Sequence, residues 1–537
     1  MPMDITRIGQ PSNTKHSPEL IGAKAANLER MAALGLPVPP AFVLPIEFCT
    51  AAVRGDTHVA EKLADGLKEG IAYLESSTGR HFGDRRCPLL VSVRSGAARS
   101  MPGMLDTVLD VGCTADAMRG LIRSFGDPRF AADCRRRFLE SYGGIVLGIE
   151  ASAFARRLHD AVAAEGADSM QALDGEALGR LLAAYEDVIE QASHGLAHEP
   201  MDQLKGATDA VYRSWMSERA VVYRKLQHLK DLQGTAVTVQ AMVYGNCGSG
   251  SGSGVAFSRD PSTGAAAPVI DVLFASQGED VVSGSHTPDT EAAIVRSLPA
   301  VAAQLRDALT RLEDEFGDVQ DVEFTIEKGK LWLLQTRAAK RTPQAAVRFA
   351  IDFVNEDRIT PAQALRRLDG IDLAALATQH LVDAGPAAAR GTGASAGIAV
   401  GRAVFDPASA VRLAATGDPI ILMRPDTTTA DVAGFAVAAG IVTAIGGRTA
   451  HAALVARQMG KPCVVGCAAL AVEPAQQRAC VNGAVLKEGD WVSIDGEGGT
   501  VHLARGTVVT KRPEAELREI ARWQAEGLDM TSSAKAT

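Results

Sequence analysis

The first 340 residues alternate between apolar segments typical of β-strands and segments typical of helices. The strand-like segments include PLLVSVRSG (88–96), GTAVTVQAMVYG (234–245) and DVEFTIEKGKLWLLQTR (321–337). Between the first two, residues 113–230 have a largely helical pattern, with charged faces and few helix-breaking residues. This mixture predicts an α+β or α/β domain over residues 1–340, with a helical insertion at 113–230.

The pattern changes after residue 340. The segment TPQAAVRFAIDFVNEDRITPAQALRRL is helical in character, and DAGPAAARGTGASAG (383–397) is rich in Ala and Gly, so we expect a helical linker over 341–390 that ends in a flexible connector. Residues 391–505 alternate apolar runs such as PIILMR, GIVTAIG and WVSID with short helical stretches, which predicts a compact α/β domain. An amphipathic helix and a fraying polar tail are expected over 506–537.

Composition narrows the possible partners. The 537 residues are 46% hydrophobic, and the net charge of −9 argues against binding to nucleic-acid phosphates or to an anionic bilayer. No apolar run approaches the roughly 18 to 20 residues of a membrane span, and MPMDITRIGQ lacks the apolar core of a signal peptide. The eight cysteines are scattered, so we expect reduced thiols. We therefore expect a cytoplasmic protein whose partners are small molecules and proteins.

One histidine lies where a loop is expected to become a helix. In GGRTAHAALVARQMGKPCVVG (446–466), two glycines precede His451, and a good helix-forming run follows it. Helix N-termini favour anions and disfavour imidazolium, so His451 should be neutral and nucleophilic. Gly446 and Gly447 would let the backbone approach a phosphoryl group attached to that histidine. The pattern predicts a catalytic phosphohistidine; the alternative is a histidine that serves as an ordinary cap or core residue.

Several long motifs carry a family resemblance. GGRTAHAALVARQMGKPCVVGC resembles the phosphohistidine motif of the PEP-utilising enzymes. GAKAANLERMAALGLPVPPAF and VSVRSGAARSMPGMLDTVLDVG resemble the N-terminal domain of the pyruvate, phosphate dikinases, and the SMPGM form favours these over PEP synthase. The likeness covers nearly residues 20–505. It implies an ATP-grasp-like nucleotide-binding domain (1–340), followed after the linker by a swivelling α/β phosphohistidine domain (391–505).

The resemblance also implies which residues bind the nucleotide. ATP needs cations for its phosphates, carboxylates for Mg²⁺ and a loop that closes over it. Lys24 in GAKAANL and Arg94 in VSVRSGA match the phosphate-binding positions of the family, and Gln240 in GTAVTVQAMVYGN is placed with the nucleotide. GNCGSGSGSGVAFSRDP (245–261) is expected to be a mobile lid, although it departs from the family in having no acidic residue within GSGSGSG. The three arginines at 135–137 either help to hold inorganic phosphate or form a solvated helix face.

The segment 321–337 can be analysed directly as a hairpin. Asp321 and Glu323 are two apart on a strand and share a face. If residues 327–329 form a three-residue loop with glycine in the left-handed conformation, Gln335 and Arg337 fall on that same face. Two carboxylates, an amide and a guanidinium then converge, which predicts a Mg-nucleotide site with Asp321 and Glu323 as metal ligands; the alternative is a solvated outer face.

These expectations define a reaction. By resemblance, Mg·ATP and inorganic phosphate phosphorylate His451 and leave AMP and pyrophosphate. The family's C-terminal pyruvate or PEP barrel needs about 250 residues, so we expect the acceptor, pyruvate or another, to bind to a separate polypeptide. The alternative is a non-catalytic ATP-binding regulatory protein descended from a truncated dikinase. The family usually has Ser before the histidine and this chain has Ala450; Thr449 is retained, so regulation there stays open.

Overall fold

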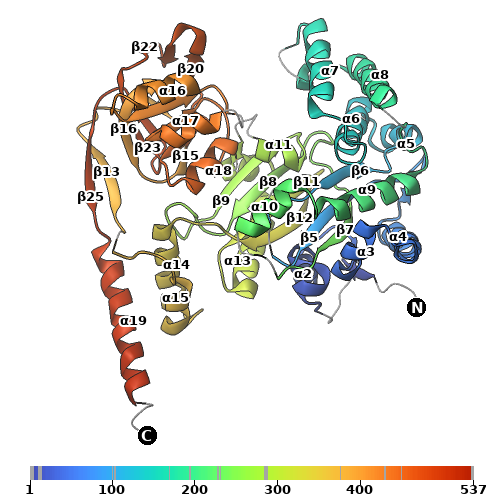
Figure 1. Cartoon of the computed structure of the whole chain (residues 1–537), viewed down its shortest axis with the longest axis horizontal. Helices are drawn as coiled ribbons and strands as arrows, with labels where there is room; N and C mark the ends of the chain where they lie inside the picture. The colour runs from blue at the N-terminus through green and yellow to red at the C-terminus, as the bar shows by residue number, and fades with distance from the viewer. Residues whose placement is uncertain are drawn as a thin grey trace. The chain divides into compact units, whose positions relative to one another are not determined.

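The computed structural model of the chain describes residues 5–533, except for 10–14, 100, 102–103, 168–169, 193–194, 227–228, 230, 284–287, 375, 428–430 and 449 (Figure 1). The described chain forms two compact units. The first contains residues up to Ser251 together with Trp332–Thr336, and the second contains Gly252–Leu331 and everything from Arg337 onward. The division after Ser251 falls within the segment that the sequence assigns to one nucleotide-binding domain.

The first unit is organised around a five-stranded sheet with the strand order β1-β2-β7-β5-β6. Its strands are β1 (Thr6–Ile8), β2 (Ala41–Leu44), β5 (Val91–Ala97), β6 (Thr107–Val111) and β7 (Thr235–Ala241); a small pair is formed by β3 (His81–Phe82) and β4 (Pro88–Leu89). All seven residues of β7 are buried, as expected for a strand inside the sheet. The predicted strand segments around residues 88–96 and 234–245 are therefore confirmed.

Helices pack on this sheet or on one another, and they account for most of the described residues between 113 and 230. They are α1 (Pro18–Ile21), α2 (Ala23–Ala33), α3 (Cys49–Arg54), α4 (Thr57–Thr78), α5 (Ala115–Phe125), α6 (Pro128–Ile145), α7 (Ala151–Ala164), α8 (Gly175–Ala192), α9 (Pro200–Ser214) and α10 (Glu218–Leu226), of which α7 and α8 pack on α6. Short polar caps mark several starts: Thr114 accepts from the Ala117 N–H, and Asp127 accepts from the Phe130 N–H. The helices and the sheet share one apolar core, to which α6, α8 and α9 contribute many residues.

The arginines at 135–137 lie on α6 and are not a solvated face. Each exposes only 6% of its surface, and carboxylates pair with all three. Both Arg136 and Arg137 hydrogen-bond to Asp133, with Nε–oxygen distances of 3.0 and 2.9 Å, and Arg135 pairs with Glu186 at 2.8 Å. The solvated-face expectation is wrong, because an arginine buried in a core needs a local counter-charge.

The second unit begins with most of a sheet in the order β10-β9-β8-β11-β12; the middle of its last strand, Trp332–Thr336, is assigned to the first unit. The strands are β8 (Gly252–Phe257), β9 (Val269–Phe274), β10 (Asp289–Thr290), β11 (Gln320–Glu327) and β12 (Lys330–Ala338), and the helices beside them are α11 (Gly278–Ser283), α12 (Glu291–Ser297) and α13 (Pro299–Phe316). β8 pairs antiparallel with β9 on one side and β11 on the other.

The glycine-rich stretch 245–261 is therefore not a mobile lid along its whole length. Its second half contains β8, in which every residue is buried. A Cβ on Gly254 would lie 2.4 Å from both Phe324 Cζ and the Asp271 carbonyl oxygen. The glycine is there because neighbouring strands approach too closely for a side chain, a packing role that composition cannot distinguish from flexibility.

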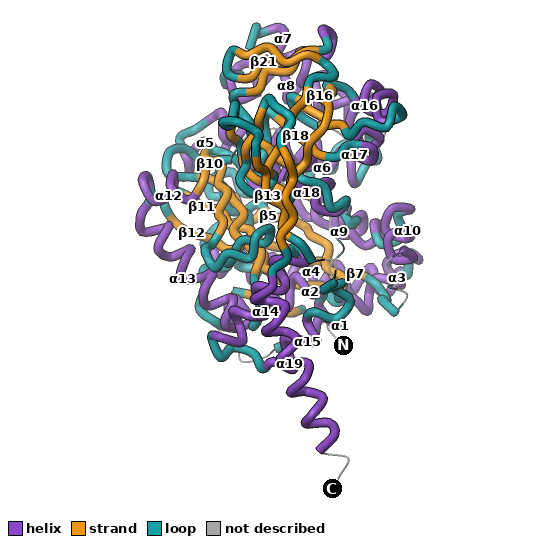
Figure 2. Tube along the Cα trace, turned by 90° about the vertical axis from the view of Figure 1, so that its left-hand side faces the viewer, coloured by secondary structure: helices purple, strands orange, loops and turns teal. Residues whose placement is uncertain are grey.

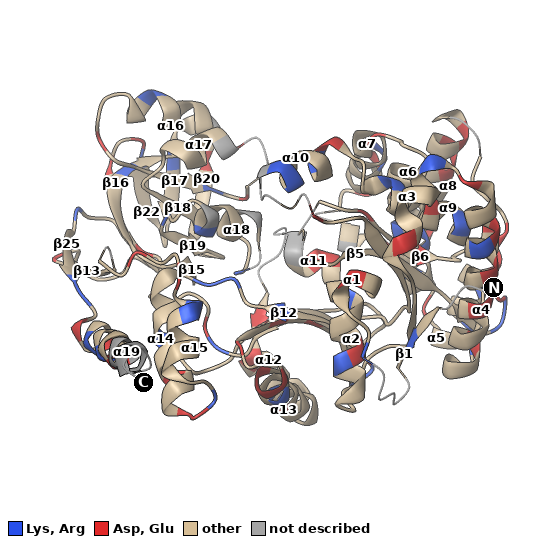
Figure 3. Ribbon diagram, turned by 60° about the horizontal axis from the view of Figure 1, so that its bottom comes forward, with Lys and Arg blue, Asp and Glu red and all other residues tan. Residues whose placement is uncertain are grey.

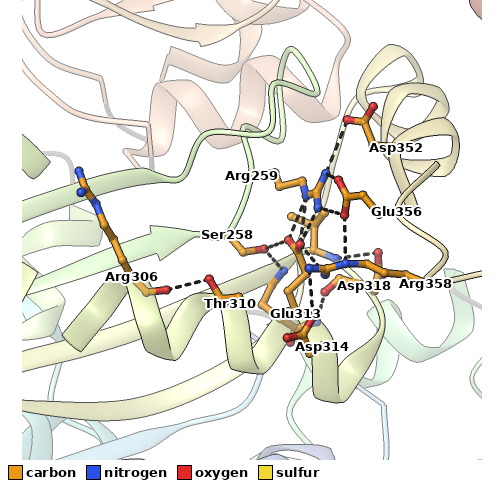
Figure 4. A network of polar contacts seen from close by, with 12 residues as sticks. Ser258, Arg259, Arg306, Thr310, Glu313, Asp314, Asp318, Asp352, Glu356 and Arg358 are labelled. Carbon is orange, nitrogen blue, oxygen red and sulfur yellow. Dashed lines mark hydrogen bonds and ion pairs between the residues drawn. The ribbon is translucent and has the colours of Figure 1, made fainter. Parts of the chain in front are cut away.

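A buried ion-pair cluster fastens the linker helix α14 (Pro343–Asn355) to this sheet (Figure 4). Arg259, just after β8, pairs with Glu313 of α13 at 2.8 Å and with Glu356 at 2.6 Å. Arg358 also pairs with Glu313 at 2.8 Å, and the Arg259 guanidinium lies 4.6 Å from the ring centre of Phe353. Arg259 and Glu313 are each only 5% exposed, so the ion pair between these two residues is shielded from water.

The predicted α/β region forms an eight-stranded sheet with the order β14-β24-β23-β16-β17-β18-β19-β15. The strands are β14 (Ala389–Arg390), β15 (Thr392–Ser395), β16 (Ile398–Val404), β17 (Ile420–Arg424), β18 (Gly440–Thr443), β19 (Cys463–Val465), β23 (Trp491–Asp495) and β24 (Thr500–His502). Strands β16 to β19 pair in parallel, and β23 and β24 are antiparallel. Figure 2 shows these strands as a layer next to α16, α17 and α18.

Each face of this sheet has its own core. α16 (Pro407–Ala414), α17 (Val432–Val437) and α18 (His451–Gln458) pack on one face, where Ile420, Leu422 and Ile441 point. On the other face Ile421 and Met423 join a core with the small sheet β20 (Leu470–Glu473), β21 (Arg478–Val481) and β22 (Ala484–Lys487). The alternation along β17 is what permits both faces to be covered.

The Ala/Gly-rich stretch 383–397 is not a free connector. Ala389–Arg390 and Thr392–Ser395 form the two edge strands β14 and β15, which pair with β24 and β19. Ala394 is fully buried and Ser395 is 3% exposed, because small side chains fit against the neighbouring strands. The expected flexible connector is therefore wrong for these two strands, which form part of the sheet.

The remaining elements lie along the linker. α14 is followed by α15 (Pro361–Arg367), and β13 (Thr378–Val382) pairs with β25 (Thr507–Lys511) as a separate ribbon. The predicted C-terminal helix is present as α19 (Glu514–Ser533), which packs beside α14 and α15 through buried Ile520 and Trp523 (Figures 1 and 2). Elements that precede residues 391–505, namely β13, α14 and α15, therefore contact elements that follow them, namely β25 and α19.

Charge and thiols agree with the sequence-based picture. In Figure 3 the charged residues are concentrated on helices such as α12 and α13, whereas the strands β17 to β19 are almost free of them. All eight cysteines are free thiols, as expected. Within the described part of the chain, no helix is both long enough and apolar enough to cross a membrane.

Candidate functional site

The loop that leads into α18 contains the candidate nucleophile. α18 begins at His451, as predicted, and the residue before it, Ala450, has the extended conformation of a helix N-cap (φ −60°, ψ 157°). Ala450 offers no side-chain acceptor, so no side-chain cap bonds the first N–H groups of the helix. Such groups favour an anion. The side chain of His451 and the whole of Thr449 lie outside the described residues, so regulation at Thr449 stays a prediction.

Arg448, in the same loop, is held at three points. Its backbone N–H donates to Asp271 Oδ2 at 3.2 Å, and its Nε donates to the Gly393 carbonyl at 3.0 Å. Its own carbonyl accepts from Arg457 Nη2 at 2.6 Å, and Arg457 Nη1 donates to the Ala394 carbonyl at 2.7 Å. These bonds fix the path of the chain that enters α18 and attach it both to β15 and to β9.

Asp271 was missed by the sequence analysis. It lies in β9, is 6% exposed, and receives the Arg448 N–H within the second unit. Burial raises the pKa of Asp271, while the positive charge of Arg448 opposes that rise. The loop also packs tightly beside it, because a Cβ on Gly447 would lie 2.6 Å from Pro288 Cδ. The only signal in the sequence was a single acidic residue inside the apolar run VIDVLF.

Asp321 and Arg337 form the ion pair of the predicted hairpin. Arg337 Nε donates to Asp321 Oδ2 at 2.8 Å, and Asp321 is 7% exposed. Burial raises the pKa of Asp321, Arg337 lowers it, and the neighbouring charge of Glu323 raises it further. Arg457 of α18 also lowers the pKa of Asp321. The two carboxylates and the guanidinium therefore share one electrostatic environment, as the hairpin analysis predicts.

The turn that connects the hairpin differs from the prediction. Glu327 is the last residue of β11, and the loop contains only Lys328 and Gly329, both with positive φ (48° and 78°). Regular pairing from a two-residue turn would set Val319 opposite residue 338, yet the Ala339 N–H donates to the Val319 carbonyl. The register therefore shifts by one residue along the hairpin, and this shift lets Arg337 meet Asp321 despite the shorter loop.

In the first unit, Arg94 and Gln240 come together on adjacent strands. Arg94 Nη1 lies 3.5 Å from Gln240 Oε1, at the long limit of a hydrogen bond. Gln240 is 2% exposed, and its Nε2 donates to the Pro39 carbonyl at 3.2 Å. Lys24 lies in the first turn of α2 and is half-buried. Gln335 belongs to the β12 segment of this unit and is 7% exposed.

Asp321 and Glu323 are suited to hold a magnesium ion that takes its remaining ligands from water and from substrate phosphates. Mg²⁺ prefers carboxylate oxygens, retains several waters and is completed by substrate phosphates. Asp321 Oδ1 is buried without a hydrogen-bond partner among the described residues, whereas Oδ2 is taken by Arg337. Glu323 follows two residues along the strand. No group of three or more His, Cys, Asp or Glu side chains is gathered for a metal in the described ranges, so the protein would supply at most two carboxylates here.

Two models of known protein families match different regions of this chain. Residues 56–303 and 298–357, which together cover more than half of the chain, match the family model "Pyruvate phosphate dikinase, AMP/ATP-binding domain". Residues 416–499 match "PEP-utilising enzyme, mobile domain". Asp271 lies in the first match, and Arg448 and His451 lie in the second. The two matches describe a nucleotide-binding region and a mobile domain in one polypeptide.

Curated relatives agree with these matches. The chain is 39% identical over 544 residues to the pyruvate, phosphate dikinase of Rhizobium meliloti (strain 1021), covering 97% of this chain and 60% of the relative. It is 39% identical to the Clostridium symbiosum enzyme of that name (92% and 57%) and to the chloroplastic one of Flaveria pringlei (96% and 54%). This chain belongs to the pyruvate, phosphate dikinase family. It spans between 54% and 60% of the length of these three relatives.

Proposed function

We propose that this chain is the ATP-dependent phosphotransferase component of a dikinase and that His451 carries the phosphoryl group. A ring nitrogen of His451 attacks the β-phosphorus of ATP, the bond from that phosphorus to the oxygen that bridges it to the α-phosphorus breaks, and AMP leaves with that oxygen. An oxygen of inorganic phosphate then attacks the terminal phosphorus of the pyrophosphohistidine. Pyrophosphate is released and phosphohistidine remains.

One observation supports this proposal most strongly. The Arg448 N–H donates to Asp271, so the loop three residues before His451 is bonded to a strand of the segment that matches an AMP/ATP-binding domain. A histidine that attacks a bound nucleotide must be held near it, because positioning supplies much of the rate of such transfers. The contact provides this positioning through a buried carboxylate.

Each remaining site residue has a proposed role. Lys24 and Arg94 bind the nucleotide phosphates, because fixed cations balance their negative charge. Gln240 and Gln335 bind the nucleotide through their amide groups.

Asp321 and Glu323 would hold Mg²⁺, which would neutralise charge on the phosphates when bound. Burial raises the pKa of Asp321, and the Arg337 guanidinium opposes that rise while it occupies only Oδ2. Asp321 Oδ1 thereby stays available as a ligand.

The phosphoryl acceptor belongs to a different part of the reaction. The two matched family segments are a nucleotide-binding domain and a mobile domain, and neither is described as an acceptor domain. We propose that pyruvate, or another acceptor, binds outside these two matched regions and receives the phosphoryl group from His451.

The test is AMP release per chain. Purified protein with Mg·ATP and phosphate should release about one AMP per chain and then stop, because a filled His451 cannot react again. Adding pyruvate alone should change nothing, and adding a separately expressed dikinase barrel with pyruvate should restore sustained turnover. Sustained production of PEP by residues 1–537 alone would contradict the proposal that the acceptor binds outside the two matched regions. No AMP under any condition would favour a non-catalytic nucleotide-binding protein.

A further inference from the structure

A buried hydroxyl in the first unit has no hydrogen-bond partner. Thr238 lies in the middle of β7 and is completely buried, and its Oγ1 makes no hydrogen bond within the described parts of the chain. Leaving such a group unpaired costs stability, and a valine of the same shape would avoid the cost. A threonine at this position therefore calls for an explanation outside the packing of the sheet.

The position of Thr238 suggests that explanation. In the ladder between β5 and β7, Thr238 lies directly opposite Arg94, and Gln240 lies opposite Ser92. Residues 238 and 240 share one face of β7, and directly opposed residues share a face across the ladder. The unpaired hydroxyl thus lies in the polar row that contains Arg94 and Gln240.

The hydrogen bond between Arg94 and Gln240 is weak. The distance from Nη1 to Gln240 Oε1 is 3.5 Å, which a small change of rotamer would break. A phosphate offers the guanidinium a much stronger, charge-assisted partner. When Arg94 turns toward a phosphate it loses the Gln240 contact, and the stem of its side chain remains opposite Thr238.

We propose that Thr238 is a positioning residue for Arg94 in the nucleotide complex: its hydroxyl accepts a hydrogen bond from the Arg94 guanidinium once that group has turned from Gln240 to a phosphate of ATP. Only in that state does a hydrogen bond offset the free-energy cost of burying the hydroxyl. The inference rests on the proposed function, because it requires Arg94 to bind a phosphate.

Thr208 provides a matched control. It lies in α9, is 1% exposed, and its Oγ1 is likewise without a partner among the described residues. T208V and T238V therefore remove the same kind of buried hydroxyl, one far along the chain from the polar row and one inside it. Both should leave the nucleotide-free protein as stable as the wild type or more stable.

The experiment measures Mg·ATP affinity and nucleotide-free melting temperature for T238V, T238S, T208V, R94Q and the double variant R94Q/T238V. T238V should weaken Mg·ATP binding by roughly tenfold, the scale of a lost hydrogen bond to a charged group. T238S should restore binding because it keeps the hydroxyl, and T208V should bind like the wild type. In an R94Q background T238V should have no further effect, because its role is exerted through Arg94.

Several results would overturn the inference. Unchanged Mg·ATP affinity in T238V would show that the hydroxyl has no role in the complex. An equal loss in the R94Q background would show that Thr238 acts without Arg94. Unfolding of T238V would show that the hydroxyl is bonded in the nucleotide-free protein. Failure of the wild type to bind Mg·ATP would contradict the proposed function as well, and it is recognised because the wild type itself then fails.

Discussion

The backbone N–H of Arg448 and the carboxylate of Asp271 are joined by a hydrogen bond of 3.2 Å, although the two residues are 177 positions apart in the chain. Arg448 precedes His451 by three residues, and Asp271 is 6% exposed on β9. The donor is a backbone N–H, so the bond requires only one particular side chain, that of Asp271, together with the right position of the loop. It connects the mobile-domain match to the AMP/ATP-binding match.

Removing the carboxylate should slow the phosphorylation of His451. In D271A the loop loses its acceptor, and we expect the rate at saturating Mg·ATP to fall by about tenfold, while nucleotide affinity stays near that of the wild type. D271N keeps an oxygen acceptor and should lose much less. Rapid-quench measurement of phosphohistidine checks both variants. D289A, on the exposed β10, is the control, and a D271A rate equal to that of D289A would contradict the positioning role.

Glu323 should matter for the use of metal-bound nucleotide more than for folding. It is only partly buried, and a carboxylate on a hairpin surface contributes little to stability. We expect E323Q to raise the KM for Mg·ATP by about tenfold or more, with a melting temperature close to that of the wild type. In a titration with Mg²⁺ at fixed ATP, E323Q should need more Mg²⁺ than the wild type to reach half of its maximal activity. If activity and melting temperature instead fall together, Glu323 is a structural residue.

Asp133 should make stability sensitive to strong acid. Burial alone would raise the pKa of Asp133, but Arg137 and Arg136 lower it from 3.8 to about 2. A group with a lowered folded-state pKa contributes stability above its unfolded value and loses it as the pH falls through the folded value. The contribution is about 2 kcal/mol and should disappear between about pH 4 and pH 2.

The variant D133N tests this dependence. At pH 7 it should lose about 3–5 kcal/mol, because two buried arginines lose the carboxylate that they share, although Arg136 keeps Glu140. Chemical denaturation at pH 7, 4 and 2 should show the gap between D133N and the wild type narrowing as the pH falls below 4. A gap that stays constant over that range would show that the charge of Asp133 does not contribute to stability.

The cluster around Glu313 should hold α14 in place. Glu313 is buried and pairs with both Arg259 and Arg358, so E313Q removes the carboxylate charge that the two arginines share at the centre of the cluster. We expect hydrogen exchange in α14 to accelerate more than in β17, which lies in a different sheet of the unit. R306Q is the control, because Arg306 lies on the same helix but is exposed (Figure 4). Equal exchange in E313Q and R306Q would contradict this role.

Local patterns predicted the elements well. The alternation in 321–337 is sufficient for a hairpin, and the run after His451 is sufficient for α18, because both depend on neighbours in sequence. Composition failed where one residue type serves two purposes. Gly254 of β8 permits close packing against Phe324, while the glycine content of the same segment suggested a lid.

Contacts between residues far apart in the chain could not be predicted from the sequence. The Asp271–Arg448 bond depends on how two sheets meet, and no periodicity encodes that meeting. The pairing of Arg136 and Arg137 with Asp133 was present as an i, i+3 and i, i+4 pattern, but its burial was set by the tertiary core. The hairpin face was predicted correctly for Arg337 even though the loop is shorter, because a register shift restored the parity.

The most direct test of the account is the chemical fate of the β-phosphorus of ATP. Incubation of the wild type with Mg·ATP labelled at that phosphorus, in the presence of phosphate, should place about one acid-labile, alkali-stable label per chain on His451. The H451N variant should remain unlabelled while it still binds Mg·ATP. Equal labelling of H451N, or a label that maps to another residue, would contradict the proposal that His451 carries the phosphoryl group.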